Sequence, residues 1–424
     1  MRRDGLSIGY ACLTVGVPDT GFKTCRKANA TEEKLKELIH FNLNSLENVI
    51  DYNIKNNIKL FRISSDIIPF GSSPVNALEW WEIFKPQFDQ IGRKIASSNM
   101  RVSMHPGQYT VLNSPNEEVI SRAVEDLVYH TKFLDSLRAG PEHKIVLHIG
   151  GVYQEKEKAM QRFVKNYQTL LSDAIKKRLV IENDDRSYTV SEVLEISQAT
   201  GAPVIYDNLH NAINTSDITK DDAYWIEQTR KTWKSEDGPQ KIHYSQQSPM
   251  SRIGAHTRTI ALDPFMDFYH RVAREDLDIM LEVKDKNLSA VKCIIATTQQ
   301  PHIKLLEKEW SLYKYSVLEK SPKLYDAIRQ LLKEKNDFPI VDFYRLLDQA
   351  LAMDGTIGTA VNAATHIYGY FKNTATEKEK IAFFKQLEKV KKSNGSLKTL
   401  KKILWKLASN SNQPYLLQSY YFVI

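Results

Sequence analysis

Short apolar runs alternate with longer amphipathic segments along the first two thirds of the chain. The apolar runs predict eight β-strands, at residues 6–12, 58–64, 100–104, 144–149, 178–182, 203–207, 241–245 and 279–283. Most of the segments between these runs repeat apolar residues with a helical period. This alternation favours an α/β fold of the (β/α)8 TIM-barrel type over a doubly wound sheet. The barrel is predicted to occupy residues 1–295.

Two of the intervening helices carry clear local signals. Thr31 is a predicted N-cap, followed by Glu33 in the first turn and by an apolar stripe that runs from Leu35 to Ile54. The next crossover, EWWEIFKPQFDQIGRKIASS, is expected to bend or restart at Pro86. Proline inside a helix removes a backbone donor and clashes with the preceding turn.

The pattern changes near residue 296, after which the segments read as helices and no clear strand follows. The stretch TTQQP at 297–301 marks the boundary, and Ser321-Pro322 is a helix-start signal. The terminal residues YYFVI are the one stretch that resembles a strand. We therefore predict a smaller all-α domain at residues 296–424.

Charge is distributed unevenly between these two parts. The 424-residue chain has a formal net charge of +7, and residues 296–424 hold 20 Lys+Arg against 12 Asp+Glu. The rest of the chain is therefore close to neutral. A weakly basic domain fits a nucleic-acid partner, but it also fits a solvated helical surface, so charge alone leaves both interpretations open.

Other compositional features indicate a cytoplasmic protein. No apolar run reaches the length of a membrane span, and MRRDGLSIGYACL does not resemble a signal peptide. The three cysteines show no CxxC pair or zinc-finger spacing, which favours a reducing compartment. We expect no membrane association, and no protein partner can be predicted.

Side chains that can bind metals stand at or just beyond the ends of the predicted strands. Parallel barrel strands present their carboxyl ends to one face, so these residues are expected to converge. Each residue alone has an ordinary structural explanation, such as a salt bridge or a solvated loop. The candidate ligands are His105, His148, Glu182, Asp207, His210, His243, His256 and Glu282.

This set contains nitrogen and oxygen donors and no thiolate, which suits Zn²⁺, Mn²⁺ or related ions. It exceeds what one ion needs, so a site with two or three metals is predicted. Such sites activate water and hold the oxygens of an in-line displacement at phosphorus. Lys241 alternates with Ile242 and is predicted to share one strand face with His243.

A second group of candidates lies in the stretch HPGQYTVLNSP, residues 105–115. Pro106 and Gly107 predict a tight turn from which Gln108 and Tyr109 project. An amide beside an aromatic ring can wedge into a stack of bases, although a rim loop that merely packs on its neighbours is the plainer alternative. Tyr10, at the end of the first strand, is a candidate stacking partner. The other histidines, His130 among them, are interpreted as incidental.

Several segments of the chain resemble those of a known family. RISSDIIPF, SMHPGQYTVLNSP, LHIGG, IENDD, DNLHNAIN, KIHYS and GAH together resemble the ultraviolet-damage endonuclease family (UvsE/UVDE), over about residues 5–293. The segments WSLYKYSVLEKSPKLYDAI, HIYGYFK and YLLQSYYF resemble the helical YbgA-like domain of uncharacterised bacterial proteins. The second resemblance implies a bacterial source and no chemistry.

The endonuclease resemblance implies a barrel with three divalent metals, commonly manganese. It also implies nicking of damaged double-stranded DNA on the 5′ side of a photoproduct, in the bacterial cytoplasm at the nucleoid. The eight candidate ligands stand where the family places its own, with Glu182 bridging two ions. Asp66 falls at a variable position. Gln108 and Tyr109 match the lesion-probing pair, and Tyr10 matches an aromatic of the lesion pocket.

Glu182, Lys241 and His243 are the predicted catalytic residues. An ordinary ammonium at Lys241 beside the metals is electrostatically awkward, so we hypothesise that Lys241 is deprotonated or carbamylated. Two other enzyme classes use similar barrels and metals, namely apurinic endonucleases of the endonuclease IV type and metal-dependent sugar isomerases. A non-enzymatic lesion-binding protein is disfavoured by the surplus of ligands, because structural zinc sites saturate at four.

Overall fold

The computed structural model describes residues 6–424, which divide into two compact units. The first unit runs through Thr14 and includes Pro18–Ile260 and Asp267–Ile294. The second unit comprises Val15–Val17, Ala261–Met266 and Ile295–Ile424. The two units are described separately below.

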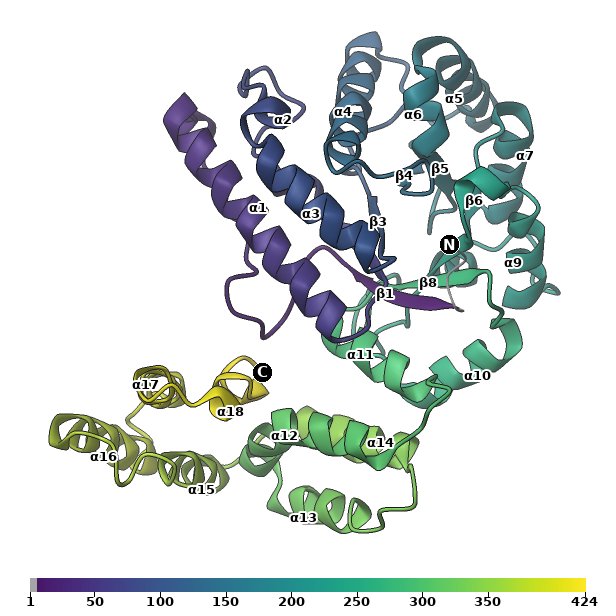
Figure 1. Ribbon diagram of the computed structural model, residues 1–424. Helices are drawn as coiled ribbons and strands as arrows, with labels where there is room; N and C mark the ends of the chain where they lie inside the picture. Colours follow the sequence, from purple (N-terminus) through teal and green to yellow (C-terminus); the bar gives the residue numbers. More distant parts are fainter. Residues whose placement is uncertain (1–5) are drawn as a thin grey trace. The chain divides into compact units, whose positions relative to one another are not determined.

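Eight parallel strands form the centre of the first unit, as the sequence predicts (Figure 1). Their hydrogen-bonded order is β6-β5-β4-β3-β2-β1-β8-β7. The strands are β1 Ser7–Ala11, β2 Leu60–Ile63, β3 Arg101–Met104, β4 Ile145–His148, β5 Leu179–Glu182, β6 Val204–Ile205, β7 Gln240–Tyr244 and β8 Leu277–Leu281.

The ends of this sheet meet through residues of the candidate site. Asp207, just beyond the two-residue strand β6, forms a parallel bridge with His243 of β7. The backbone nitrogen of His243 donates to the carbonyl oxygen of Tyr206 at 2.9 Å. The nearly closed barrel is therefore completed at its carboxyl end by two residues that the sequence identifies as ligands.

Helices connect the strands, in the alternation expected of this fold. They are α1 Glu32–Lys55, α2 Trp80–Ile83, α3 Lys85–Ser97, α4 Glu117–Ser136, α5 Lys156–Leu170, α6 Asp173–Arg178, α7 Val190–Thr200, α8 Asn208–Ile213, α9 Asp222–Arg230, α10 Leu262–Val272 and α11 Asn287–Ala296. Thr31 caps α1 by accepting from the Lys34 amide, as predicted. The predicted restart at Pro86 is also found, because Pro86 lies in the first turn of α3.

Buried charges hold the amino-terminal end of the barrel together. Arg101 is 1% exposed, donates to Asp278 at 3.0 Å, and also donates to the carbonyl oxygens of Glu142, Pro239 and Asp237. Lys144 is fully buried and donates to Asp237 at 2.5 Å. These groups lie at the strand starts, away from the face that carries the candidate ligands.

The second unit is helical from Ile303 onward. Its helices are α12 Ile303–Lys320, α13 Pro322–Leu331, α14 Ile340–Ala352, α15 Ile357–Tyr368, α16 Glu377–Lys391, α17 Leu397–Asn410 and α18 Pro414–Leu417. Ser321 caps α13, as the Ser-Pro signal predicts. The strand-like reading of YYFVI is wrong: Tyr420–Phe422 form a 3-10 turn, with Tyr421 buried in the core of the helical unit.

None of the helices among residues 6–424 combines the length and the apolar character that a membrane span requires.

Candidate metal centre

The eight predicted ligands come together at the carboxyl ends of the barrel strands, with Glu182 at the centre of the group. Glu182 is the last residue of β5 and is 1% exposed. It pairs in register with His148, the last residue of β4, so the two side chains share one face. Cross-strand neighbours in a sheet are close enough to bind one ion together.

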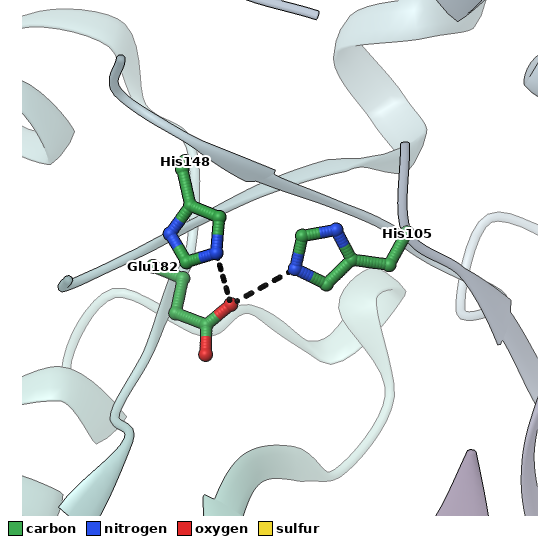
Figure 2. Close-up of side chains that lie close together, drawn as sticks. All are labelled: His105, His148 and Glu182. Carbon is green, nitrogen blue, oxygen red and sulfur yellow. Dashed lines mark hydrogen bonds and ion pairs between the residues drawn. The ribbon is translucent and has the colours of Figure 1, made fainter. Parts of the chain in front are cut away.

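One carboxylate oxygen of Glu182 faces two histidines, as Figure 2 shows. Oε2 lies 3.3 Å from Nε2 of His105 and 3.7 Å from Nε2 of His148. Ligand atoms of these three residues all lie within 4.8 Å of one another, which is a spacing that a single ion can bridge.

The other oxygen of Glu182 faces a second group. Oε1 lies 2.6 Å from Nδ1 of His243 and 3.9 Å from Nδ1 of His210. Glu182, Asp207 and His243 also bring ligand atoms within 4.8 Å of one another. Because Glu182 belongs to both groups, it is placed to bridge two ions.

Glu282 and His256 extend the cluster on its far side. Glu282 lies 3.5 Å from Nδ1 of His243, and Nε2 of His256 lies 3.9 Å from the Glu282 carboxylate. Arg62 donates to the same carboxylate at 2.6 Å. The sequence interpretation missed Arg62, although a lone arginine within the apolar run KLFRI is an available signal, since a buried charge requires a partner.

Asp207 and His210 are positioned by a short helix. Asp207 is the N-cap of α8, where its Oδ1 accepts from the amide of His210 at 2.8 Å. Nδ1 of His210 lies 2.9 Å from the carbonyl oxygen of Asn183. This cap explains the three-residue spacing of the DNLH motif and directs both side chains toward Glu182.

Unsatisfied buried atoms show that this donor set fits metal ions. Oδ2 of Asp207 and Nε2 of His243 are buried and have no hydrogen-bond partner among residues 6–424. Buried polar atoms are almost always satisfied, so two unpaired donor atoms in one cluster suit coordination of a metal ion. The donors are imidazole nitrogens and carboxylate oxygens, which suit zinc, manganese and related divalent ions.

Burial and neighbouring charges shift the pKa values within the cluster in different directions. Burial alone would raise the pKa of Glu182, but the surrounding histidines, with hydrogen bonds from His105 and His243, outweigh it and hold that pKa well below its usual range. Burial lowers the pKa of His148 to about 4, which leaves the imidazole neutral. Burial opposes protonation of His210, yet Asp207 and Glu182 raise its pKa to about 9.

An open cavity of about 860 Å³ leads to the cluster. Its wall includes the ligands His105, His148, Glu182, His210, His256 and Glu282, together with Arg62 and Gln108. A cavity of this volume, in contact with solvent, can admit a large substrate.

The comparisons with known proteins agree with this geometry. Residues 6–308 match the family described as UV-endonuclease UvdE. The chain belongs to this family. Residues 314–424 match a second family, a protein of unknown function called DUF1722. Both predicted resemblances, an endonuclease barrel followed by a helical domain without known chemistry, are confirmed.

Relatives within the UV-endonuclease family cover most of the chain. The UV DNA damage endonuclease of Clostridium perfringens (strain 13 / Type A) is 37% identical over 393 residues, covering 90% of this chain and 92% of the relative. That of Bacillus cereus (strain G9842) is 33% identical over 277 residues, covering 65% and 86%. A crystal structure of SacUVDE is 37% identical, with a TM-score of 0.65, covering 72% of this chain and 99% of that one.

The predicted lesion-contacting residues of this UV endonuclease lie in different environments. Tyr109 is 70% exposed at the barrel rim, and Gln108 beside it is also exposed. Tyr10, in contrast, is fully buried, packs against the Phe61 ring and bonds through its hydroxyl to Asn53 and Thr14. The predicted stacking role of Tyr10 is therefore corrected: its ring faces the helix layer and offers no face to a base.

His130, which the sequence interpretation set aside, belongs to a group of residues that hold the loop of Gln108 and Tyr109 in place. Thr110 donates to Asp126 of α4 at 2.6 Å, and His130 of the same helix is fully buried. Nε2 of His130 lies 2.9 Å from the Ser65 hydroxyl, which donates to the carbonyl oxygen of His105 at 2.6 Å. His130 is therefore part of the frame that supports a candidate ligand.

Lys241 is buried in the barrel, whereas Asp66 lies on its surface. Lys241 is 1% exposed, and burial together with the charges of Arg101 and Arg62 lowers its pKa well below the ordinary value. Its carbamylation stays a prediction. Asp66 is exposed in a 3-10 turn and belongs to neither group of candidate ligands that the described residues form.

Proposed function

We propose that this protein is a DNA repair endonuclease that cuts damaged double-stranded DNA on the 5′ side of UV photoproducts and related lesions. One observation carries the proposal: two groups of candidate ligands share Glu182 and lie beneath the rim loop that exposes Gln108 and Tyr109. A phosphodiester-cleaving centre thus lies within reach of residues suited to probing base stacking.

The proposed ligands are His105, His148, Glu182, Asp207, His210, His243, His256 and Glu282, and they hold three divalent ions, with Mn²⁺ the first choice and Zn²⁺ an alternative. When bound, the ions supply Lewis-acid activation of the phosphate and of water. Mn²⁺ is proposed because the chain resembles a family that commonly uses manganese. The donor chemistry accommodates either metal.

The protein's own groups have defined tasks in this proposal. The shared carboxylate of Glu182 fixes the separation of the two ligand groups, and His243 orients Glu182 through the 2.6 Å contact. Arg62 holds Glu282 at 2.6 Å and adds a fixed positive charge beside the phosphate. Lys241, buried two residues before His243 on the same strand, completes the proposed catalytic set.

Gln108 and Tyr109 are proposed to enter the distorted base stack at a lesion. A damaged step has already lost part of its stacking energy, so opening it costs less than opening an intact step. An exposed aromatic ring can replace some of the lost stacking. Preference for damage would then arise from the smaller cost of opening the duplex. We place this activity in the bacterial cytoplasm, at the nucleoid.

A nicking assay tests the proposal. The substrate is a labelled duplex with one defined photoproduct, incubated with Mn²⁺ or with a chelator, and Glu182→Gln is the matched variant. We expect a metal-dependent cut immediately 5′ to the lesion that the variant fails to make. Cutting only at abasic sites would indicate an apurinic endonuclease instead, and binding of metal without cutting either duplex would redirect the search to sugar substrates.

A further inference from the structure

The positive charge of the protein is concentrated in one helical hairpin of the second unit. Residues 372–406 hold 11 lysines and 3 glutamates, a net charge of +8, although the whole chain carries only +7. The remaining residues hold 47 basic and 48 acidic side chains and are nearly neutral. Apart from bound metal ions, the rest of the chain, including the barrel of the UV-endonuclease family, therefore has almost no net charge with which to attract a polyanion.

Lysines form a stripe along the outer face of α16. Lys378, Lys385 and Lys389 follow one another at spacings of seven and four residues, and Lys392 follows just after the helix ends. These spacings return to one face of a helix, and all four side chains are exposed. At about 1.5 Å per residue the stripe is roughly 20 Å long.

The acidic residues of the segment are already engaged. Glu377 pairs with Lys380 at 2.8 Å, and Glu388 pairs with Lys391 at 2.7 Å. Glu379 accepts from Asn410 and from the cap residue Thr376. Within residues 6–424, Lys385, Lys389 and Lys392 form no ion pair, so their charges are available to a partner.

The neighbouring helix α17 adds to the same charge. Lys398 and Lys402 are exposed and four residues apart, which places them on one helix face. Lys401, between them, turns inward to Glu319 at 3.1 Å and to the Tyr421 ring. The apolar faces of both helices are buried in the core of the helical unit, so the exposed lysines lie on their outer sides.

We propose that this lysine surface, formed by Lys378, Lys385, Lys389, Lys392, Lys398 and Lys402, binds the phosphate backbone of double-stranded DNA. The inference rests on the proposed function, because it makes the hairpin a second, sequence-independent contact for the DNA substrate. Lysine acts on phosphate as a flexible point charge and reads no base, so the surface strengthens binding without selecting a sequence.

DNA fits this surface better than a membrane does. A helix that lies on a membrane needs a continuous apolar face to insert. The apolar face of α16 is occupied by core packing through Phe383, Leu387 and Val390. On its exposed side, Ile381 and Phe384 form one small apolar pair among lysines, and Phe384 packs in part against Tyr368.

Salt-dependent binding to an undamaged duplex tests the surface on the full-length protein. The variant is Lys385→Gln/Lys389→Gln/Lys392→Gln, and the matched control is Lys304→Gln/Lys323→Gln/Lys333→Gln, which removes three exposed lysines elsewhere in the same unit. Fluorescence anisotropy gives the dissociation constant at several salt concentrations. A second variant, Lys398→Gln/Lys402→Gln, probes α17 independently.

Each phosphate contact contributes about 0.9 to the slope of log K against log salt. We therefore expect the α16 variant to lower that slope by between about two and three and to weaken binding roughly tenfold or more at low salt. The control should keep the slope of the unmodified protein. Equal slopes for the variant and the control would overturn the proposal.

Two further outcomes distinguish this inference from the proposed function and from a membrane contact. Binding to undamaged DNA does not depend on cleavage, so a protein that binds as expected but never nicks a lesion would refute the proposed function and leave the surface standing. If the α16 variant instead loses binding to vesicles rich in anionic phospholipid and keeps its affinity for DNA, the surface is a lipid contact and the DNA inference is wrong.

Discussion

Tyr109 is the residue whose substitution separates lesion recognition from folding. It is 70% exposed, so its removal leaves no cavity in the core. We predict that Tyr109→Ala lowers kcat/KM on a photoproduct duplex by about tenfold or more, because stacking of one base on an aromatic ring contributes about 1–3 kcal/mol. Tyr109→Phe keeps the ring and should retain most activity. Nicking kinetics on lesion-containing duplex provide the measurement.

Tyr10, in contrast to Tyr109, contributes to folding rather than to lesion recognition. It is fully buried, and its hydroxyl bonds to Asn53 and Thr14. Tyr10→Phe should leave lesion nicking unchanged while lowering the free energy of unfolding by about 1 kcal/mol, the usual net worth of a buried hydrogen bond. A large change in kcat/KM with unchanged stability would restore Tyr10 to the lesion pocket.

Ser65 tests whether α4 positions the metal centre. Its hydroxyl bridges the His105 carbonyl oxygen and the His130 ring. Partners that orient a ligand typically contribute 10–100-fold to metal affinity. We predict that Ser65→Ala weakens Mn²⁺ binding by about tenfold and that Ser65→Thr, which keeps the hydroxyl, restores it. Calorimetric titration of Mn²⁺ measures the affinity, and Ser136→Ala, at an outer position of α4, is the control.

The sequence predicts the strands and helices of the barrel better than it predicts the direction of their side chains. Eight apolar runs with intervening helical segments are sufficient to locate all eight strands. Tyr10 was misassigned because barrel strands are buried on both faces, so their sequences lack the alternation that tells inside from outside. The strand β1 is buried throughout, and nothing in SIGYA marks which residues face the helices.

The residues that support the His105 loop were missed for a different reason. His130 and Asp126 lie on α4, far along the chain from Ser65, and only the packed fold brings them to the His105 loop. Strand ends, in contrast, converge in any parallel barrel, so their polar residues can be grouped from sequence alone. Candidate ligands are therefore visible in the sequence, whereas the residues that orient them emerge from tertiary packing.

Breaking the ion pair between Lys144 and Asp237 should destabilise the amino-terminal end of the barrel. Both side chains are nearly buried, and they lie 2.5 Å apart. Removing one partner leaves an uncompensated buried charge, which costs about 3–5 kcal/mol. We predict a loss of this size for Asp237→Asn in urea unfolding, and recovery of much of it in Lys144→Met/Asp237→Leu. An additive double variant would show that the pair is not coupled.

Lys144 should also shape the alkaline stability of the barrel. Burial lowers the pKa of Lys144, although Asp237 acts in the opposite direction. Between the lowered folded pKa and the higher unfolded value, the unfolded chain binds more protons, so the contribution of Lys144 to stability increases as pH rises through that window. Lys144→Met should abolish this increase. Urea midpoints measured from neutral pH to pH values near the ordinary lysine pKa of 10.5 test the sign.

For the whole molecule, metal binding and folding should be coupled through three carboxylates at the carboxyl ends of the barrel strands. Glu182, Asp207 and Glu282 stand at or just beyond three different strand ends, so ions held by these carboxylates and the neighbouring histidines join parts of the chain that unfolding separates. A ligand that binds only the folded state stabilises it by about 2.7 kcal/mol at a concentration 100 times its dissociation constant.

We therefore predict that Mn²⁺ raises the midpoint of thermal unfolding in a concentration-dependent manner and that a chelator reverses the shift. Glu182→Gln should reduce the shift most, because Glu182 belongs to both ligand groups. Asp66→Asn, which changes an exposed carboxylate outside both groups, should leave the shift intact. Equal shifts in all three proteins would place the stabilising ion elsewhere in the molecule, and the bridging role of Glu182 would have to be abandoned even if lesion nicking were observed.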